Sequence, residues 1–64
     1  MPNLTLRQWR RVREITVLEM ANRLGVSKPT YIAWERNPSK IRISYAEKIA
    51  DILGVSREDL FPEA

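Results

Sequence analysis

The stretch from residue 16 to residue 35, TVLEMANRLGVSKPTYIAWE, constrains the fold of this chain more than any other. Thr16 can accept a hydrogen bond from the first turn of a helix, and Glu19 can complete a capping box with it. Gly25 suits the left-handed backbone that commonly follows the last turn of a helix. These signals predict a helix over residues 16–24.

A second helix is expected directly after a tight turn. Ser27 can cap it, and Pro29 falls in its first turn, where a missing N–H group costs little. Tyr31 and Trp34 are three residues apart, which predicts that both point back at the preceding helix. A helix over 27–35, joined to its neighbour through a glycine-containing turn, predicts a helix-turn-helix. The second helix of such a pair commonly enters the major groove of DNA.

The order of residues in this motif resembles that of the Cro/C1-type (Xre-like) transcriptional regulators. The resemblance extends over about Leu4 to Phe61. It rests on an ordered series: Arg10, Glu19-Met20-Ala21, Leu24-Gly25-Val26-Ser27, Thr30, Trp34-Glu35-Arg36, and the segment AEKIADILGV from Ala46 to Val55. The resemblance implies an all-α fold, a compact five-helix lambda-repressor-like DNA-binding domain whose second and third helices form the helix-turn-helix.

Three further helices are expected, and each begins at a hydroxyl residue that can cap it. They are 5–14, starting at Thr5; 44–53, starting at Ser44; and 56–61, starting at Ser56. Gln8 and Glu47 stand three residues after their caps and can complete capping boxes. Gly54 is placed to end the fourth helix. Residues 36–40 are expected to form a loop, because the Asn-Pro pair within them interrupts a helix.

The apolar residues predict one shared core. Ile41 and Ile43 alternate with Arg42, so both isoleucines are expected to point inward. The full set expected to share the core is Leu6, Trp9, Ile15, Leu18, Ala21, Leu24, Val26, Tyr31, Trp34, Ile43, Ala46, Ile49, Leu53, Val55 and Leu60. Its aromatic members could instead stack on unpaired bases, but aromatic residues at helical spacing are more often core residues. We therefore expect a single helix-turn-helix domain over residues 1–64.

The composition argues against an enzyme. The chain has 64 residues with no cysteine and no histidine. It therefore lacks disulfides, thiolate metal ligands and the commonest general base. No pair of the remaining polar residues stands at a catalytic spacing, and no cofactor, metal or small-molecule ligand is expected. Glu58 and Asp59 suit the positive end of a short helix and need no metal to explain them.

The start of the chain, MPNLTLRQWRRVRE, is too charged for a signal peptide. No apolar run approaches the roughly 20 residues that a membrane-spanning helix needs. A cytoplasmic location without membrane contact is therefore expected.

The net charge of +3 is unevenly distributed. Residues 1–42 contain nine basic and three acidic side chains, a net charge of +6. Residues 43–64 contain two basic and five acidic side chains, a net charge of −3. The positive charge over residues 1–42 suits a protein that presents one side to a polyanion. The alternative is that charged residues on short helices are ordinary solvated surface.

Arg10 lies beside the apolar face of the first helix, and an arginine near a core needs a carboxylate partner. Glu35, at the end of the third helix, is the candidate, and the family resemblance implies that such an ion pair joins these two helices. Arg7, Arg11 and Arg13 lie elsewhere on the first helix. They are free for phosphate or are simply solvated.

The resemblance places the start of the third helix in the major groove of double-stranded DNA. The implied base-contacting residues are Ser27, Lys28, Pro29, Thr30, Ile32 and Ala33. The lysine can donate to guanine O6 and N7, and the two hydroxyls can reach a base edge or a phosphate. The other three side chains have no donor and can only pack on thymine methyl groups. Direct readout is therefore limited, and the shape of the DNA is expected to contribute.

Phosphate contacts are expected at both ends of the helix-turn-helix. The residues are Val17, Arg36, Asn37, Lys40 and Arg42. Val17 stands where the family often has Gln, so a contact there would come from the N–H groups of the helix end. The other four lie in the loop where the family holds the DNA backbone. Contacts of this kind position a protein without specifying a sequence.

The leading hypothesis is a sequence-specific double-stranded DNA-binding transcriptional regulator, a repressor of the phage or mobile-element type. It would act as a homodimer on a palindromic operator with half-sites about one helical turn apart. Its dimer surface is expected around Ile52, Val55, Leu60 and Phe61. The alternative hypothesis is an antitoxin- or adaptor-like protein-interaction module that uses the apolar surface of the third helix.

Overall fold

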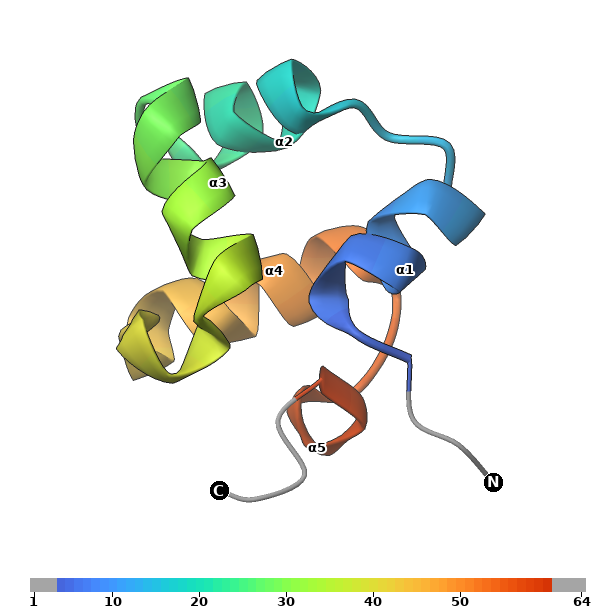
Figure 1. Cartoon of the computed structure of the whole chain (residues 1–64). Coiled ribbons are helices and arrows are strands. Elements are labelled where there is room, and N and C mark those ends of the chain that lie inside the picture. Colours follow the sequence, from blue (N-terminus) through green and yellow to red (C-terminus); the bar gives the residue numbers. More distant parts are fainter. Residues whose placement is uncertain (1–3, 61–64) are drawn as a thin grey trace.

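The computed structural model describes residues 4–60, which form five α-helices and one short 3-10 helix (Figure 1). They are α1 (Leu6–Val12), α2 (Val17–Leu24), α3 (Lys28–Arg36), η1 (Pro38–Lys40), α4 (Ile43–Leu53) and α5 (Arg57–Leu60). The described residues contain no strand, so the expected all-α, five-helix fold is confirmed. The 3-10 helix η1 lies where the sequence predicts only a loop.

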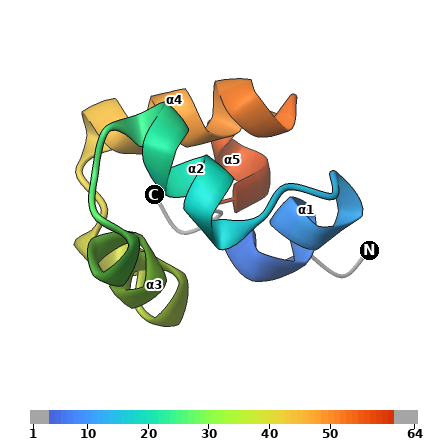
Figure 2. The same cartoon turned by 90° about the horizontal axis from the view of Figure 1, so that it is seen from above.

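The helices are arranged around α2. Seen from above, α2 lies between α1 and α3, with α4 behind it (Figure 2). α2 packs against both α3 and α4, and α5 packs against α4. This packing leaves the outer side of α3 facing solvent, where Lys28, Pro29 and Thr30 are exposed.

Side-chain caps start α1 and α2 as the sequence predicts. Thr5 Oγ1 accepts from the Gln8 N–H over 3.1 Å, and Gln8 Oε1 accepts from the Thr5 N–H over 2.8 Å, which is a complete capping box. Thr16 Oγ1 accepts from the Glu19 N–H over 3.0 Å. The second half of the predicted box at α2 does not form, because the Glu19 carboxylate accepts from Arg23 over 2.7 Å instead.

The prediction for the start of α4 is wrong. The helix begins at Ile43, after Arg42, whose side chain makes no capping hydrogen bond, so Ser44 is not the cap and no capping box with Glu47 forms. Ile43 is 68 % exposed rather than inward-facing, whereas Ile41 packs against the core. The strand-like alternation fails here because Ile43 is already helical, and each helical residue turns by about 100° from the one before it.

Three helices end with a residue of left-handed backbone. After α2 and α4 this residue is Gly25 and Gly54, both at φ 73°, as the sequence predicts. After α1 it is Glu14, at φ 59°. The amides of Glu14 and Ile15 bond back to carbonyls of the last turn of α1 over 3.0 and 3.1 Å, which is a Schellman motif. A side chain disfavours this backbone, so Glu14 carries local strain.

The buried core draws on all five α-helices and the α1–α2 loop. Its members are Leu6, Ile15, Met20, Ala21, Leu24, Tyr31, Ile49, Ala50, Leu53 and Leu60. Most agree with the sequence, but Leu18 does not, because it is 56 % exposed while Met20 is fully buried. The inner face of α2 runs through positions 20, 21 and 24, which leaves Leu18 to one side.

The aromatic side chains of Trp9, Tyr31 and Trp34 belong to the core rather than to a base-stacking surface. Tyr31 is fully buried, and Trp9 and Trp34 are partly buried against the core. Val26 and Val55 pack against it in the same way. Burial of the Tyr31 ring excludes it from stacking on unpaired bases.

Candidate nucleic-acid interface

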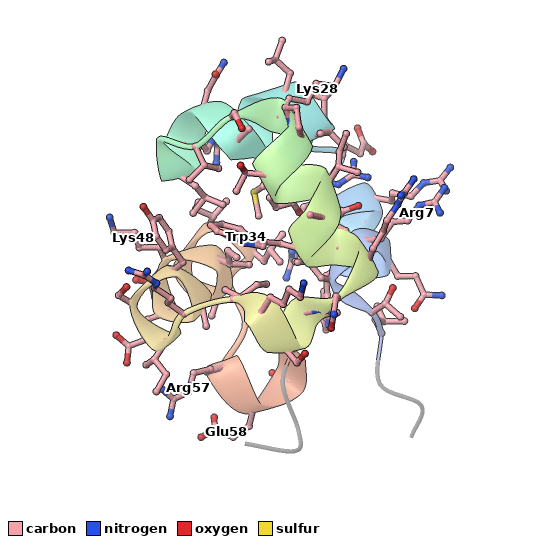
Figure 3. All side chains as sticks on the ribbon, turned by 60° about the vertical axis from the view of Figure 1, so that its left-hand side comes forward. Arg7, Lys28, Trp34, Lys48, Arg57 and Glu58 are labelled. Atoms are coloured by element: carbon pink, nitrogen blue, oxygen red, sulfur yellow. The ribbon has the colours of Figure 1, made fainter. Side chains whose placement is uncertain are left out.

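The predicted base-contacting residues lie together on the outer side of α3. All are exposed except Ile32, which is half-buried: Ser27, Lys28, Pro29, Thr30, Ile32 and Ala33. Figure 3 looks onto this side and shows Lys28 at the upper end of the helix. The opposite side of α3 is fixed to the core by Tyr31, so these residues cannot turn away from solvent without unfolding the motif.

Few free donors are present on this surface. Ser27 Oγ accepts from the Thr30 N–H over 3.3 Å and donates its own proton to Thr30 Oγ1 over 2.9 Å. The Ser27 hydroxyl is therefore occupied by capping, while the Thr30 O–H remains able to donate outward. Lys28 adds an exposed ammonium group in the first turn. The surface can thus offer one cation, one hydroxyl donor and an apolar strip.

Arg10 and Glu35 form the ion pair that the sequence predicts. Arg10 Nε donates to Glu35 Oε2 over 2.6 Å, and Nη2 donates to Oε1 over 3.5 Å. Only 11 % of the Arg10 side chain and 10 % of the Glu35 side chain are exposed. Arg10 Nη1 also donates to the Ile15 carbonyl over 2.8 Å. One guanidinium therefore fixes α1, the α1–α2 loop and the end of α3 relative to one another.

The surroundings of this pair shield it from most of the solvent. The hydrogen bond to Glu35 raises the pKa of the Arg10 guanidinium, so it stays charged. Burial raises the pKa of the Tyr31 phenol above its usual range, and the nearby Glu35 carboxylate raises it further. Among residues 4–60, neither the Tyr31 hydroxyl nor the Trp9 Nε1–H has a hydrogen-bond partner of good geometry. These two groups are unsatisfied polar atoms inside the core.

The loop between α3 and α4 is short, structured and basic. Asn37 Oδ1 accepts from the Ser39 hydroxyl over 2.7 Å, and the Asn37 carbonyl accepts from the Lys40 N–H over 3.0 Å. The side chains of Arg36, Lys40 and Arg42 are exposed. Of the four predicted phosphate-contacting loop residues, Asn37, Lys40 and Arg42 follow α3, whereas Arg36 is the last residue of α3 itself rather than a loop residue.

Val17, the remaining predicted phosphate-contacting position, is the first residue of α2 and is half-buried against the core. Its side chain can contribute only packing. The Thr16 cap occupies the N–H of Glu19. The earlier amides of this helix end remain as possible anion donors.

Besides the loop that joins them, α3 and α4 make an aromatic contact that is not evident from the sequence. The Trp34 ring packs on Tyr45 of α4 with ring centroids 5.0 Å apart, rather than turning only toward α2. The Lys48 ammonium lies 5.6 Å from the centroid of the Tyr45 ring. No spacing signal connects these residues, because they come from two helices separated by a loop.

Arg13 is a structural residue as well. Its Nε donates to the Leu53 carbonyl at the end of α4 over 2.8 Å, and its guanidinium carbon lies 5.7 Å from the centroid of the Trp9 ring. A cation at a helix C-terminus satisfies a free carbonyl and interacts favourably with the helix dipole. Of the three arginines left open by the sequence, Arg13 is thus committed to packing.

Residues 4–60 contain neither a candidate metal site nor a membrane-spanning helix. They hold no group of three or more acidic, histidine or cysteine side chains placed to bind a metal ion. Within the same residues, no helix has the length and apolar character that crossing a bilayer requires.

Comparison with known proteins agrees with this geometry. A family model described as helix-turn-helix matches residues 6–60. An uncharacterised helix-turn-helix-type transcriptional regulator of Methanocaldococcus jannaschii is 38 % identical over 56 residues, which cover 88 % of this chain and 85 % of the relative. The transcriptional repressor RstR of the cryptic phage CTXphi, from Vibrio cholerae, is 32 % identical over 59 residues. Those residues cover 92 % of this chain but only 53 % of RstR, so the chain spans about half of that relative. No solved structure gave a significant match. The chain therefore belongs to the Cro/C1-type helix-turn-helix family.

Proposed function

We propose that this protein is a sequence-specific double-stranded DNA-binding transcriptional regulator, a repressor of the phage type that acts in the cytoplasm. The observation that carries the proposal is the solvent-facing side of α3, which is flanked by a basic turn and held on the core by the Arg10–Glu35 pair. The names of the two relatives, a transcriptional regulator and a phage repressor, support the same function.

In the proposed complex, α3 enters the major groove with its first turn leading. Lys28 donates to guanine O6 and N7, and Thr30 donates through its free hydroxyl. Pro29 and Ala33 pack on thymine methyl groups, with the half-buried Ile32 behind them. With so few donors, discrimination between sequences also depends on the shape of the DNA.

The DNA backbone is held on both sides of the groove. Arg36 contacts phosphates from the end of α3, and Asn37, Lys40 and Arg42 do so from the turn after it. The amide groups at Val17 contact phosphates from the start of α2. The basic side chains among them are exposed and lie close together in the chain. These contacts determine the orientation and affinity of the protein on DNA, while α3 determines which DNA sequence it prefers.

We propose a homodimer on a palindromic operator, because one module of this size covers too little DNA for tight binding. The dimer surface expected from the sequence needs correction. Leu60 is only 7 % exposed, and Ile52 and Val55 pack against the core. Phe61 lies outside the described residues. The core uses most of the apolar groups that the sequence assigns to a partner subunit.

The alternative, a protein-interaction module, is not favoured. Its surface would be the apolar strip on α3, which is exposed at Pro29 and Ala33. That strip is bordered by Lys28 and by the basic turn after α3, and neither feature suits an apolar protein contact.

The test is fluorescence anisotropy of a labelled random duplex of about 30 base pairs, titrated across salt, followed by selection of a preferred sequence. Affinity is expected to fall steeply with salt, and each phosphate contact contributes about 0.9 to the slope of log K against log salt concentration. Lys40→Gln and Arg42→Gln should flatten that slope, whereas Lys28→Gln should change the selected sequence. No binding at low salt would exclude the DNA-binding function.

A further inference from the structure

The side chains of two arginines of α1 make no ion pair or hydrogen bond within residues 4–60. Arg7 and Arg11 are both exposed, and neither has an ion-pair partner among the described residues. The other two arginines of this segment are committed, Arg10 to Glu35 and Arg13 to the carbonyl of Leu53. Arg7 and Arg11 are therefore the basic groups of α1 that remain available to an external anion.

Their placement is unfavourable for the isolated protein. Arg7 and Arg11 are four residues apart, so the two like charges are neighbours on one face of α1. Arg7 lies in the first turn, where the helix dipole is positive, and that turn contains no acidic residue. The repulsion disfavours both cations and the dipole disfavours Arg7, whereas Arg11 lies in the last turn, where the dipole favours a cation. A bound polyanion would compensate the repulsion and the unfavourable position of Arg7.

The direction of this face follows from the Arg10–Glu35 bond. Arg10 points from α1 to the end of α3, and Arg7 lies three residues earlier, next to Arg10 on the same flank. Figure 3, which looks onto the outer side of α3, shows Arg7 at the right-hand margin of this view and Arg57 toward the lower end of the molecule. Arg7 therefore extends from the edge of the surface proposed to meet DNA.

We propose that Arg7 and Arg11 bind phosphates of the DNA that α3 enters, as a phosphate-binding pair outside the helix-turn-helix. This inference rests on the proposed DNA-binding function. Because Arg10 couples α1 to α3, the pair keeps a fixed distance from the groove-entering helix. It adds affinity and sets the tilt of the protein on the duplex without reading bases.

The experiment compares salt titrations of the wild type with those of Arg7→Gln, Arg11→Gln and the double variant on a random duplex of about 30 base pairs. Arg57→Gln is the matched control, since Arg57 is a partly exposed arginine on α5 whose loss removes the same charge. Each lost phosphate contact should lower the slope by about 0.9, and two should weaken binding more than tenfold at roughly 0.1 M salt. Arg57→Gln should change neither.

Two further readouts separate phosphate binding from damage to the fold. Arg7→Lys keeps the charge and should retain most of the wild-type slope. All four variants of Arg7 and Arg11 should melt at or above the wild-type temperature, because they relieve or preserve an exposed like-charge contact. The variants should also weaken binding equally on random and selected duplexes.

The outcomes distinguish this inference from the proposed function. A wild type that binds duplex DNA while the double variant keeps its slope would overturn the phosphate-binding pair alone. A wild type that does not bind duplex DNA would overturn both. A flatter slope in the double variant, with Arg57→Gln unchanged, is the expected result.

Discussion

The Arg10 guanidinium of α1 and the Glu35 carboxylate of α3 are joined by a 2.6 Å hydrogen bond, although α2 separates the two helices in the sequence. Both side chains are about nine-tenths buried. Each therefore depends on the other for compensation of its lost hydration. This mutual dependence gives a sharp expectation for mutagenesis.

The losses from removing the two partners should not add. Glu35→Met leaves a buried arginine with only the Ile15 carbonyl, and we expect a loss of about 3 kcal/mol in the free energy of unfolding. Arg10→Met should cost a similar amount. The double variant should cost less than the sum of the two, with a coupling of roughly 2 kcal/mol. Urea denaturation checks this, and additive losses would show that the pair is not energetically coupled.

The Tyr31 hydroxyl has no hydrogen-bond partner of good geometry among residues 4–60, so Tyr31→Phe should be neutral or stabilising, within about 1 kcal/mol. The same variant should change the response to alkali. Because the folded-state pKa of Tyr31 lies above its usual 10.0, the unfolded chain releases this proton first as pH rises. Stability from this group is intact below pH 10 and declines above it by up to about 1.4 kcal/mol per pH unit.

Thermal melts between neutral pH and pH 11 check the alkaline response. The wild type should lose stability above pH 10 and Tyr31→Phe should lose less. Tyr45→Phe is the control on a half-buried tyrosine. Parallel curves for wild type and Tyr31→Phe would contradict a raised pKa at Tyr31.

Met20 and Leu18 should respond oppositely to truncation. Met20 is fully buried, so Met20→Ala should cost about 2–5 kcal/mol, a large part of the roughly 3–10 kcal/mol available to a chain of this length. Leu18 is 56 % exposed, so Leu18→Ala should stay within about 0.5 kcal/mol of the wild type. Chemical denaturation of the two variants measures the difference. A large loss of stability in Leu18→Ala would instead show that the inner face of α2 is assigned to the wrong residues.

Glu14→Gly should stabilise the protein. Glu14 holds φ 59° at the end of α1, a backbone conformation that glycine adopts without a side-chain penalty. Relief of this strain, partly offset by the greater freedom of glycine in the unfolded chain, should give a gain of about 0.5–1 kcal/mol. The melting temperature reports it.

Gly25→Ala is the converse control for Glu14→Gly. A Cβ at Gly25 would meet nothing within 4 Å, so the expected loss of about 1 kcal/mol comes from its positive φ alone. If Glu14→Gly destabilises while Gly25→Ala behaves as expected, the Glu14 side chain makes a contribution other than strain.

The sequence by itself determined which segments are helical and where most of them begin and end. Thr5, Thr16 and Ser27 cap their helices, and Gly25 and Gly54 end theirs, because these signals act between residues three to five apart. It also determined the Arg10–Glu35 pair through the family resemblance, and the outer side of α3 through the inward position of Tyr31.

Only the tertiary structure decided which side chains are shared between elements. Met20 rather than Leu18 is buried, Ile43 faces solvent at an uncapped helix start, Tyr45 packs on Trp34, and Arg13 is held by the end of α4. Each depends on how two helices meet, which local propensity does not encode. Where long-range packing competes with a local pattern, the burial of apolar surface decides, since it contributes more free energy than a cap or a preferred spacing.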